Sequence, residues 1–294
     1  MIQLTRVRTV PPIHSNFFGA KRKQLNLELI KQKLKGELNE EGGNKWNSQI
    51  WKEAKEQLLI ETHNKCAYCE TPTSVVAYGD VEHFRPKSVY WWLAYCYENY
   101  LASCTICNQK YKKDKFELET PSKKLTGPSV TNSTTAAELI EVAAKLTPDP
   151  ISDGEGMPFA QFEKDILGES ALLLHPYHQN PAEFFAYEPI LANKEVVVIP
   201  TNPNFNRMVK AAEDFYGINR QELMDLRFQA YIQYMTFRHV LSNQNLPANL
   251  LTACSNRLEE MRADFAAYAG MIRYFDTKDL SELPWDFNIN LTGS

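Results

Sequence analysis

The chain has 294 residues, of which 44% are hydrophobic, enough for one large or two ordinary domains with a buried core. Its formal net charge of −4 argues against a protein that coats nucleic acid nonspecifically, because phosphate neutralisation supplies most of such binding. No apolar run reaches the roughly 20 residues that cross a bilayer, and the first residues lack the apolar centre of a signal peptide. We therefore expect a cytoplasmic protein with no membrane partner.

The N-terminal part is predicted to form two helices between residues 20 and 60, broken at Glu40-Glu41-Gly42-Gly43-Asn44. The second helix carries apolar residues at three- and four-residue spacing, including Trp46, Trp51 and Leu59, which indicates a buried stripe. We expect this stripe to pack on the segment that follows. The first helix is rich in lysine and leucine and is expected to be an ordinary amphipathic helix, with phosphate contact as the alternative.

Four cysteines then occur in two C-x2-C pairs, Cys66 with Cys69 and Cys104 with Cys107. Four thiolates at about 2.3 Å suit a tetrahedral zinc ion, and the intervening chain is long enough for two knuckles to close on one ion. Because metal-ligand spacing occurs twice, we prefer a structural zinc to the alternative of unrelated buried cysteines. Cys96 and Cys254 are left over and are expected to be buried in a reducing compartment.

The segment between the cysteine pairs predicts a strand, a loop, a second strand and a helix. Val75, Val76 and Tyr78 suit a strand, and Gly79-Asp80 indicates a turn or bulge that presents Glu82 and His83. The lysine-rich run after the second knuckle predicts a short helix starting near Asn108. Zinc would pin the start of that helix against the loop before the first strand.

These residues resemble the HNH nucleases, which have the ββα-metal fold. In that family a histidine ending the first strand activates water, an asparagine in the loop holds the histidine's backbone, and a histidine or asparagine on the helix binds a divalent cation. The resemblance implies these three roles for His83, Asn99 and Asn108. The residue before the histidine is usually an aspartate that binds the same cation, and here it is Glu82, which is longer by one methylene.

A narrower resemblance is to the PtuB family, the HNH subunits of Septu and certain retron anti-phage systems. It rests on V-E-H-F-R-P-K, W-L-A-Y, S-C-x-x-C-N, L-L-L-H-P and G-I-N-R, and extends in patches to about Asp276. It implies a bacterial protein that works with a PtuA-like ATPase, and in a retron also with a reverse transcriptase and non-coding RNA. DNA is the favoured substrate, and tRNA is the alternative for retron-linked relatives.

The residue chemistry agrees with a phosphodiesterase. His83 is the member of the cluster that titrates near neutral pH, as a general base should. Glu82 and Asn108 offer hard oxygen ligands for Mg²⁺ or Mn²⁺, whereas the cysteines suit zinc. Taken singly, a His-Glu pair is more often a surface ion pair and an asparagine more often a cap. The rival from another class is a zinc ribbon that recruits a partner and cuts nothing, but such a module needs no base beside a carboxylate.

Basic residues gather around the motif, eight against four acidic ones between His83 and Lys124. We expect a basic surface that contacts nucleic acid, the alternative being a solvated helix. The aromatic residues from Tyr90 to Tyr97 could stack on unpaired bases, but a role in the core of the module is preferred. The residues expected to contact nucleic acid are Arg85, Lys87, Lys110, Lys112 and Lys113.

Residues 121–170 are predicted to be a linker or insertion rich in turns, with one short helix from Ala136 to Leu146. After it, Val196 to Ile199 predicts a buried strand. His175 and His178 lie in H-P-Y-H, which favours a turn, and neither a carboxylate nor a cysteine is suitably spaced to join them on a metal. We therefore interpret these histidines as structural.

The C-terminal third is predicted to be helical over residues 207–216, 221–241 and 248–275, the two long helices forming an antiparallel pair. Gly217 is the predicted C-cap of the first helix, and Asn219 is a predicted N-cap of the second. Leu283 to Trp285 could dock in a groove of this chain or of another. No Walker A motif occurs, so control by a nucleotide would have to come from a partner.

The sequence as a whole therefore predicts an α+β fold that is mostly α-helical. A small zinc-pinned HNH module at 61–120 would be embedded between an N-terminal helical region, 1–60, and a C-terminal helical region, 171–294, after the linker. The C-terminal region is the predicted surface for partner docking.

Overall fold

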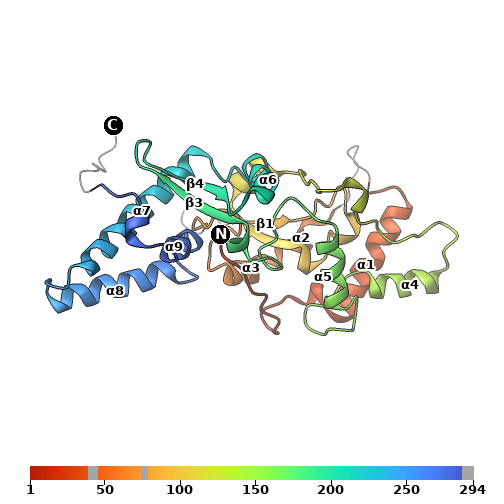
Figure 1. The fold of residues 1–294 in the computed structure, drawn as a ribbon. Coiled ribbons are helices and arrows are strands. Elements are labelled where there is room, and N and C mark those ends of the chain that lie inside the picture. The colour runs from red at the N-terminus through yellow and green to blue at the C-terminus, as the bar shows by residue number, and fades with distance from the viewer. Residues whose placement is uncertain (39–45, 74–78, 287–294) are drawn as a thin grey trace.

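Helices dominate the fold, and the described residues form two small antiparallel sheets of two strands each. The structure is a computed structural model that describes residues 1–38, 46–73 and 79–286. In the view of Figure 1 the molecule is elongated. The helices α7 (Gln221–Ser242), α8 (Ala248–Arg262) and α9 (Ala269–Asp276) lie at one end, α1 (Gly19–Leu34) and α4 (Ala136–Lys145) lie at the other, and β1 (Asp80–His83) lies between them. The mixed and mainly helical fold class expected from the sequence is confirmed. Within the described residues, no helix is both long and apolar enough to cross a membrane.

The N-terminal part contains α1 (Gly19–Leu34), α2 (Ser48–Lys52) and α3 (Lys55–Glu61). The sequence predicted a single second helix. This prediction is wrong in detail, because the segment is divided into α2 and α3. The side chain of Asn47 caps α2 by accepting a hydrogen bond from the backbone N–H of Gln49. The predicted break at 40–44 lies outside the described residues.

The central module follows the predicted order of strand, loop, strand and helix. β1 (Asp80–His83) pairs with β2 (Tyr100–Ser103), and a π-helix, η4 (Ile106–Lys112), follows directly. The helix begins two residues before the predicted Asn108. The strand predicted at Val75, Val76 and Tyr78 lies outside the described residues. Short 3-10 turns at Trp91–Leu93 and Tyr97–Asn99 fold the loop between the strands.

The small β1-β2 sheet separates two hydrophobic cores. Tyr100 and Ala102 face the core built with α1, α2 and α3, whereas Leu101 faces the core that contains the cysteines and the C-terminal helices. Because side chains alternate along a strand, neighbouring residues of β1 are sent to different cores. This arrangement decides where the expected site residues point.

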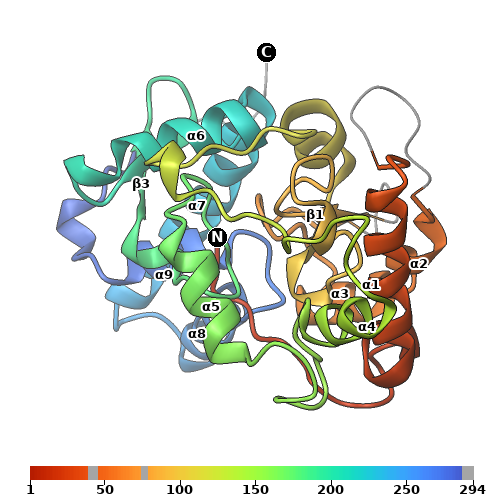
Figure 2. The ribbon, with the colours of Figure 1, turned by 90° about the vertical axis from the view of Figure 1, so that its right-hand side faces the viewer.

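The segment at 121–170 is more ordered than a linker. The predicted helix is confirmed as α4 (Ala136–Lys145), which is capped by a Thr135–Glu138 capping box and packs beside α1, as both views indicate (Figures 1 and 2). A second helix, α5 (Phe159–Gly168), was not predicted. It buries Phe162 and Ile166, so it contributes to the core.

In the C-terminal part, the predicted strand is confirmed as β4 (Glu195–Pro200), paired in a hairpin with β3 (Phe185–Ile190), which was not predicted. The helices α6 (Asn206–Tyr216) and α7 (Gln221–Ser242) agree with the prediction, and α8 packs against α7. The helix predicted at 248–275 is wrong, because it is divided into α8 (Ala248–Arg262) and α9 (Ala269–Asp276).

Gly217 ends α6 in the left-handed conformation, with φ of 63°, as predicted. A Cβ at this position would lie 2.6 Å from the Tyr111 ring, so the contact requires glycine. The N-cap prediction for Asn219 is wrong. Arg220 occupies the N-cap position of α7, and the Asn219 side chain instead bonds the N–H and C=O of Val198 in β4.

The tail docks on this chain. Leu283 is buried, and the Tyr231 hydroxyl of α7 donates to the carbonyl of Pro284 at 2.6 Å. The Trp285 ring stacks on His239 of the same helix. Of the two docking possibilities left open by the sequence, the structure supports the groove within the chain.

Candidate metal centre and active site

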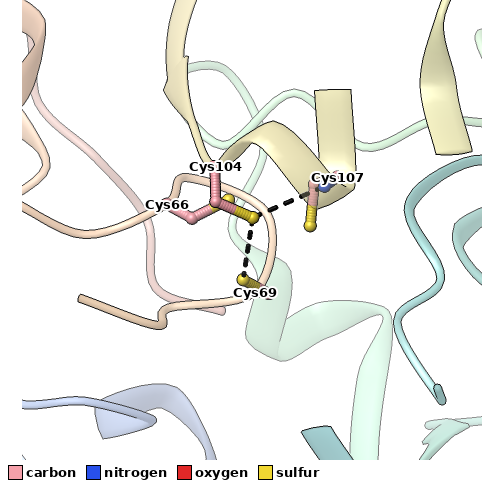
Figure 3. A group of neighbouring side chains, drawn as sticks. All are labelled: Cys66, Cys69, Cys104 and Cys107. Atoms are coloured by element: carbon pink, nitrogen blue, oxygen red, sulfur yellow. Dashed lines mark hydrogen bonds between the residues drawn. The ribbon is translucent and has the colours of Figure 1, made fainter. Parts of the chain in front are cut away.

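The four thiols predicted to hold zinc lie together. The Sγ atoms of Cys66, Cys69, Cys104 and Cys107 are all within 4.8 Å of one another, and Figure 3 shows them converging from the first knuckle and from the start of η4. A tetrahedral ion with zinc–sulfur bonds of about 2.3 Å keeps its sulfurs roughly 3.8 Å apart. The 4.0 Å between the Sγ atoms of Cys69 and Cys104 is close to that spacing. The donor set therefore fits a structural zinc ion.

Backbone and charged groups hold this cluster in place. The Ala67 N–H donates to the carbonyl of Ala102 in β2 at 2.9 Å, which ties the first knuckle to the sheet. The Arg220 guanidinium lies 3.5 Å from the Sγ of Cys107 and 4.0 Å from that of Cys69. Zinc with four thiolates has an excess of negative charge, so a guanidinium beside two sulfurs would stabilise it. Arg220 is the last residue of the G-I-N-R motif, and the sequence alone did not indicate the role of this arginine.

His83 ends β1 and points into the core on the α2 side of the sheet. Its Nε2 is 3.0 Å from the carbonyl oxygen of Ala94, and its ring makes edge contacts with Trp51 and Tyr100. A carbonyl only accepts, so Nε2 carries the proton and Nδ1 keeps a free lone pair. Burial, followed by the positive charge of Lys87, lowers the pKa of His83 to about 3. The imidazole is therefore neutral at pH 7, with Nδ1 as its acceptor. The expectation from the sequence that His83 titrates near neutral pH is wrong for this closed arrangement, because burial disfavours the protonated ring and makes it a weaker base.

Asn99 clamps the loop directly after His83. Its Oδ1 accepts from the backbone N–H of Arg85 at 2.9 Å, and its Nδ2 donates to the carbonyl of Arg85 at 3.0 Å. The backbone N–H of Phe84 donates to the carbonyl of Asn99. The sequence predicted that Asn99 holds the backbone of His83 itself. In the structure it holds the backbone two residues further on, while Lys112 donates to the His83 carbonyl at 3.1 Å.

Glu82 points to the opposite side of the sheet from His83, as strand alternation requires. Its carboxylate lies 2.5 Å from the ammonium of Lys112, which is fully buried on η4. Burial raises the pKa of Glu82, and the charge of Lys112 opposes the rise. The expected metal ligand is therefore already paired with a cation from the protein.

Asn108 lies one helical turn before Lys112 and faces Asp80, two residues before Glu82. Its Nδ2 is 3.4 Å from an oxygen of Asp80, which also accepts from Gln109 at 3.0 Å. The structure thus pairs Asp80 with Asn108 and Glu82 with Lys112, and does not join Glu82, His83 and Asn108 around one point. In the part of the chain described, the four thiols form the sole cluster of three or more Cys, His, Asp or Glu ligands. The expected Mg²⁺ or Mn²⁺ site does not fit this arrangement.

The expected basic surface is smaller than predicted. Arg85 is 3% exposed and donates to Glu169 at 2.7 Å and to the carbonyl of Ile166, so its guanidinium is enclosed by the end of α5. Lys112 is buried as described, and in this structure neither residue reaches solvent to contact phosphate. Lys110 and Lys113 are exposed and Lys87 is half-buried, so these three are open to a ligand.

The aromatic loop fills the core, as preferred from the sequence, with Tyr90, Trp91, Tyr95 and Tyr97 buried and Trp92 partly exposed. His175 is also buried, and its ring packs against Phe84 at 4.3 Å. His178 pairs with Glu163 at 3.2 Å. These contacts support the structural interpretation of both histidines.

Comparison with known proteins yields two related sequences, both named Septu protein PtuB. The chain is 26% identical to that of Bacillus mycoides over 189 residues, which cover 60% of this chain and 50% of the relative. It is 39% identical to that of Bacillus thuringiensis over 79 residues, which cover 26% of this chain and 30% of the relative. The likeness to PtuB proteins expected from the motifs is confirmed.

The chain spans half or less of the length of these relatives, so what the whole proteins do enters below as a proposal. No protein-family model matches the chain, and no solved structure matches it significantly.

Proposed function

We propose that this chain is a nuclease subunit of a bacterial anti-phage complex and that His83 is its general base. The observation that carries the proposal is the 3.0 Å contact between Nε2 of His83 and the carbonyl oxygen of Ala94. The Ala94 carbonyl holds the proton on Nε2, and this leaves Nδ1 as the acceptor for a proton from water. A histidine in a simple zinc ribbon would need no such arrangement.

The surrounding residues keep this base in one orientation. Lys112 donates a hydrogen bond to the His83 carbonyl, and Asn99 donates one to the carbonyl of Arg85. The Tyr100 hydroxyl donates to the same Ala94 carbonyl that Nε2 contacts, at 2.7 Å. Preorganisation of this kind limits the movement needed when the base accepts a proton. Lys87, Lys110 and Lys113 would bind phosphates of the substrate.

The proposed reaction is hydrolysis of a phosphodiester by water. The water oxygen bonds to phosphorus while its proton passes to Nδ1 of His83, and the bond from phosphorus to one sugar oxygen breaks. That oxygen leaves as a hydroxyl after taking a proton from solvent. We assign no step to a divalent cation, because Glu82 and Asn108 each have another partner in this structure. Attack by an outside water needs no 2′-hydroxyl, so DNA and RNA are both possible substrates. We favour DNA, with tRNA as the alternative.

The proposed partner is a PtuA-like ATPase, which would supply substrate binding and control of timing. The two relatives are Septu proteins, which supports a place in a Septu system. The net charge of −4 supports a partner that carries part of the substrate affinity. If the system is a retron, a reverse transcriptase and its non-coding RNA would join the complex.

The test is cleavage of plasmid DNA and total tRNA by the complex with the ATPase, in Mg²⁺, in Mn²⁺ and in a chelator. We expect His83→Ala to lower the rate by about 10²- to 10⁴-fold while zinc content stays unchanged. His14→Ala, at an exposed histidine, is the control for purification and handling. Equal rates in the His83→Ala and His14→Ala complexes would remove His83 from the reaction. Cleavage by neither variant nor the parent would favour a binding module.

A further inference from the structure

The imidazole of His83 is nearly closed off from solvent, with 7% of the residue exposed. One side of the ring meets Tyr100, its partner in β2, with ring centroids 5.1 Å apart. Another side meets Trp51 edge-on, with centroids 5.0 Å apart and an interplanar angle of 81°. Nε2 is turned inward to Ala94. With 7% of the residue exposed, little of the ring is left open to a phosphodiester.

The two flanking rings differ in how firmly they are held. Tyr100 is completely buried in β2, and its hydroxyl is hydrogen-bonded. Trp51 is only partly buried and lies on α2, a helix of five residues in which Ile50 is the buried side chain. The residue before α2, Asn47, is joined to the module by its backbone N–H, which donates to the Tyr95 hydroxyl at 3.0 Å. Trp51 is therefore the outer and more weakly held side of the enclosure.

Two further neighbours of Trp51 lie on the same outer side of the enclosure around His83. Its ring stacks on Tyr95 with centroids 6.2 Å apart, and the ammonium of Lys87 lies 5.5 Å from the ring centre. Of the five residues expected to contact nucleic acid, Lys87 is one of the three that solvent reaches. A substrate phosphate drawn to Lys87 would therefore arrive beside Trp51, whose indole also contacts the His83 ring.

We propose that Trp51 is a positioning residue that covers His83, and that the substrate reaches the imidazole when the indole moves away from it. The sequence pattern assigned Trp51 to a core stripe, and its contact with Tyr95 agrees with that in part. The edge contact with His83 and the nearby Lys87 indicate that Trp51 also covers the imidazole. Its consequence for cleavage depends on the proposed function, whereas its effect on the accessibility of His83 does not.

The accessibility test uses diethyl pyrocarbonate, which acylates neutral, exposed imidazoles, with the modified peptides followed by mass spectrometry. We expect Trp51→Ala to raise the modification rate of His83 by about tenfold or more, since removing the cover removes the cost of opening. Trp51→Phe, which keeps a smaller ring, should give an intermediate rate. Trp92→Ala is the matched control, because Trp92 is also partly exposed and its recorded ring contacts are with Tyr90 and Trp91.

His175, buried against Phe84, serves as an internal reference in the same peptide map. If His175 also becomes reactive in Trp51→Ala, that variant has unfolded, and the comparison is then decided by Trp51→Phe. A His83 rate in the folded variant that stays within about twofold of the parent overturns the proposal, because the cover would then have no effect on access.

Cleavage by the chain without its ATPase gives the second measurement. We expect Trp51→Ala to cut faster than the parent chain, whereas a purely structural tryptophan would give slower cleavage when it is removed. Slower cleavage together with higher His83 reactivity would overturn the part of the proposal that concerns substrate entry. Higher reactivity with no cleavage by any variant, either alone or with the ATPase, would contradict the proposed nuclease and leave the cover over His83 supported.

Discussion

Replacing Asn99 by alanine should destabilise the protein strongly, because Asn99 satisfies two backbone groups that have no access to water. The N–H and C=O of Arg85 bond the Asn99 amide at 2.9 and 3.0 Å, and Arg85 is 3% exposed. Leaving a buried polar group unpaired costs about 1 to 3 kcal/mol. With both groups unpaired, we expect the free energy of unfolding to fall by about 2 to 5 kcal/mol.

The chemistry of the clamp can be separated from packing by Asn99→Asp, which has nearly the same shape. Aspartate still accepts from the Arg85 N–H, but its second oxygen would face the Arg85 carbonyl without a proton between them. We therefore expect Asn99→Asp to be destabilising as well, although it leaves no cavity. Asn108→Ala is the control, because Asn108 is half-buried and makes a 3.4 Å contact with Asp80, and we expect a change within about 0.5 kcal/mol.

The measurement is urea unfolding in zinc-containing buffer, followed by tryptophan fluorescence. A lower midpoint at an unchanged slope reports a change in stability, whereas a changed slope reports altered compactness. If Asn99→Ala lowers the stability no more than Asn108→Ala does, the clamp around Arg85 does not stabilise the loop that follows His83.

Three further changes test other parts of the structure. Lys112→Met should lower the free energy of unfolding by about 3 to 5 kcal/mol, because it leaves the Glu82 carboxylate buried and unpaired. Adding Glu82→Gln should restore much of this loss. A double variant as unstable as the single one would exclude the ion pair as the cause. Cys107→Ser should lose zinc and become protease-sensitive, since structural zinc contributes on the order of 10 kcal/mol to folding. Elemental analysis that finds about one zinc per chain in the variant would contradict this. Burial lowers the pKa of His175 well below its usual value, so the unfolded chain takes up the proton first as the pH falls. The stability that depends on this residue is complete above about pH 6.5 and declines below it by up to about 1.4 kcal/mol per pH unit. His175→Gln should flatten that decline in urea midpoints measured between about pH 7 and 5.

Local patterns in the sequence were sufficient for much of the fold. The C-x2-C pairs predicted the thiol cluster because ligand spacing within a knuckle is a local property. Periodicity predicted α4, α6 and α7, and Gly217 marked the end of α6 because the left-handed conformation favours glycine. The helix α5 was missed because glycine- and proline-rich turns surround it. The helix at 248–275 was overextended because the apolar pattern continues through the bend that ends at Tyr268, which has a φ of 58°.

The sequence by itself determined which residue types lie in the candidate site, and the tertiary structure decided which of them meet. Glu82 and His83 are neighbours in the chain, but strand alternation directs them into different cores. Lys112 was expected to meet phosphate and instead pairs with Glu82, because η4 folds back over β1. Trp51 reaches His83 from a separate helix. Such contacts depend on how elements distant in sequence pack together, and no local pattern of residues encodes that packing.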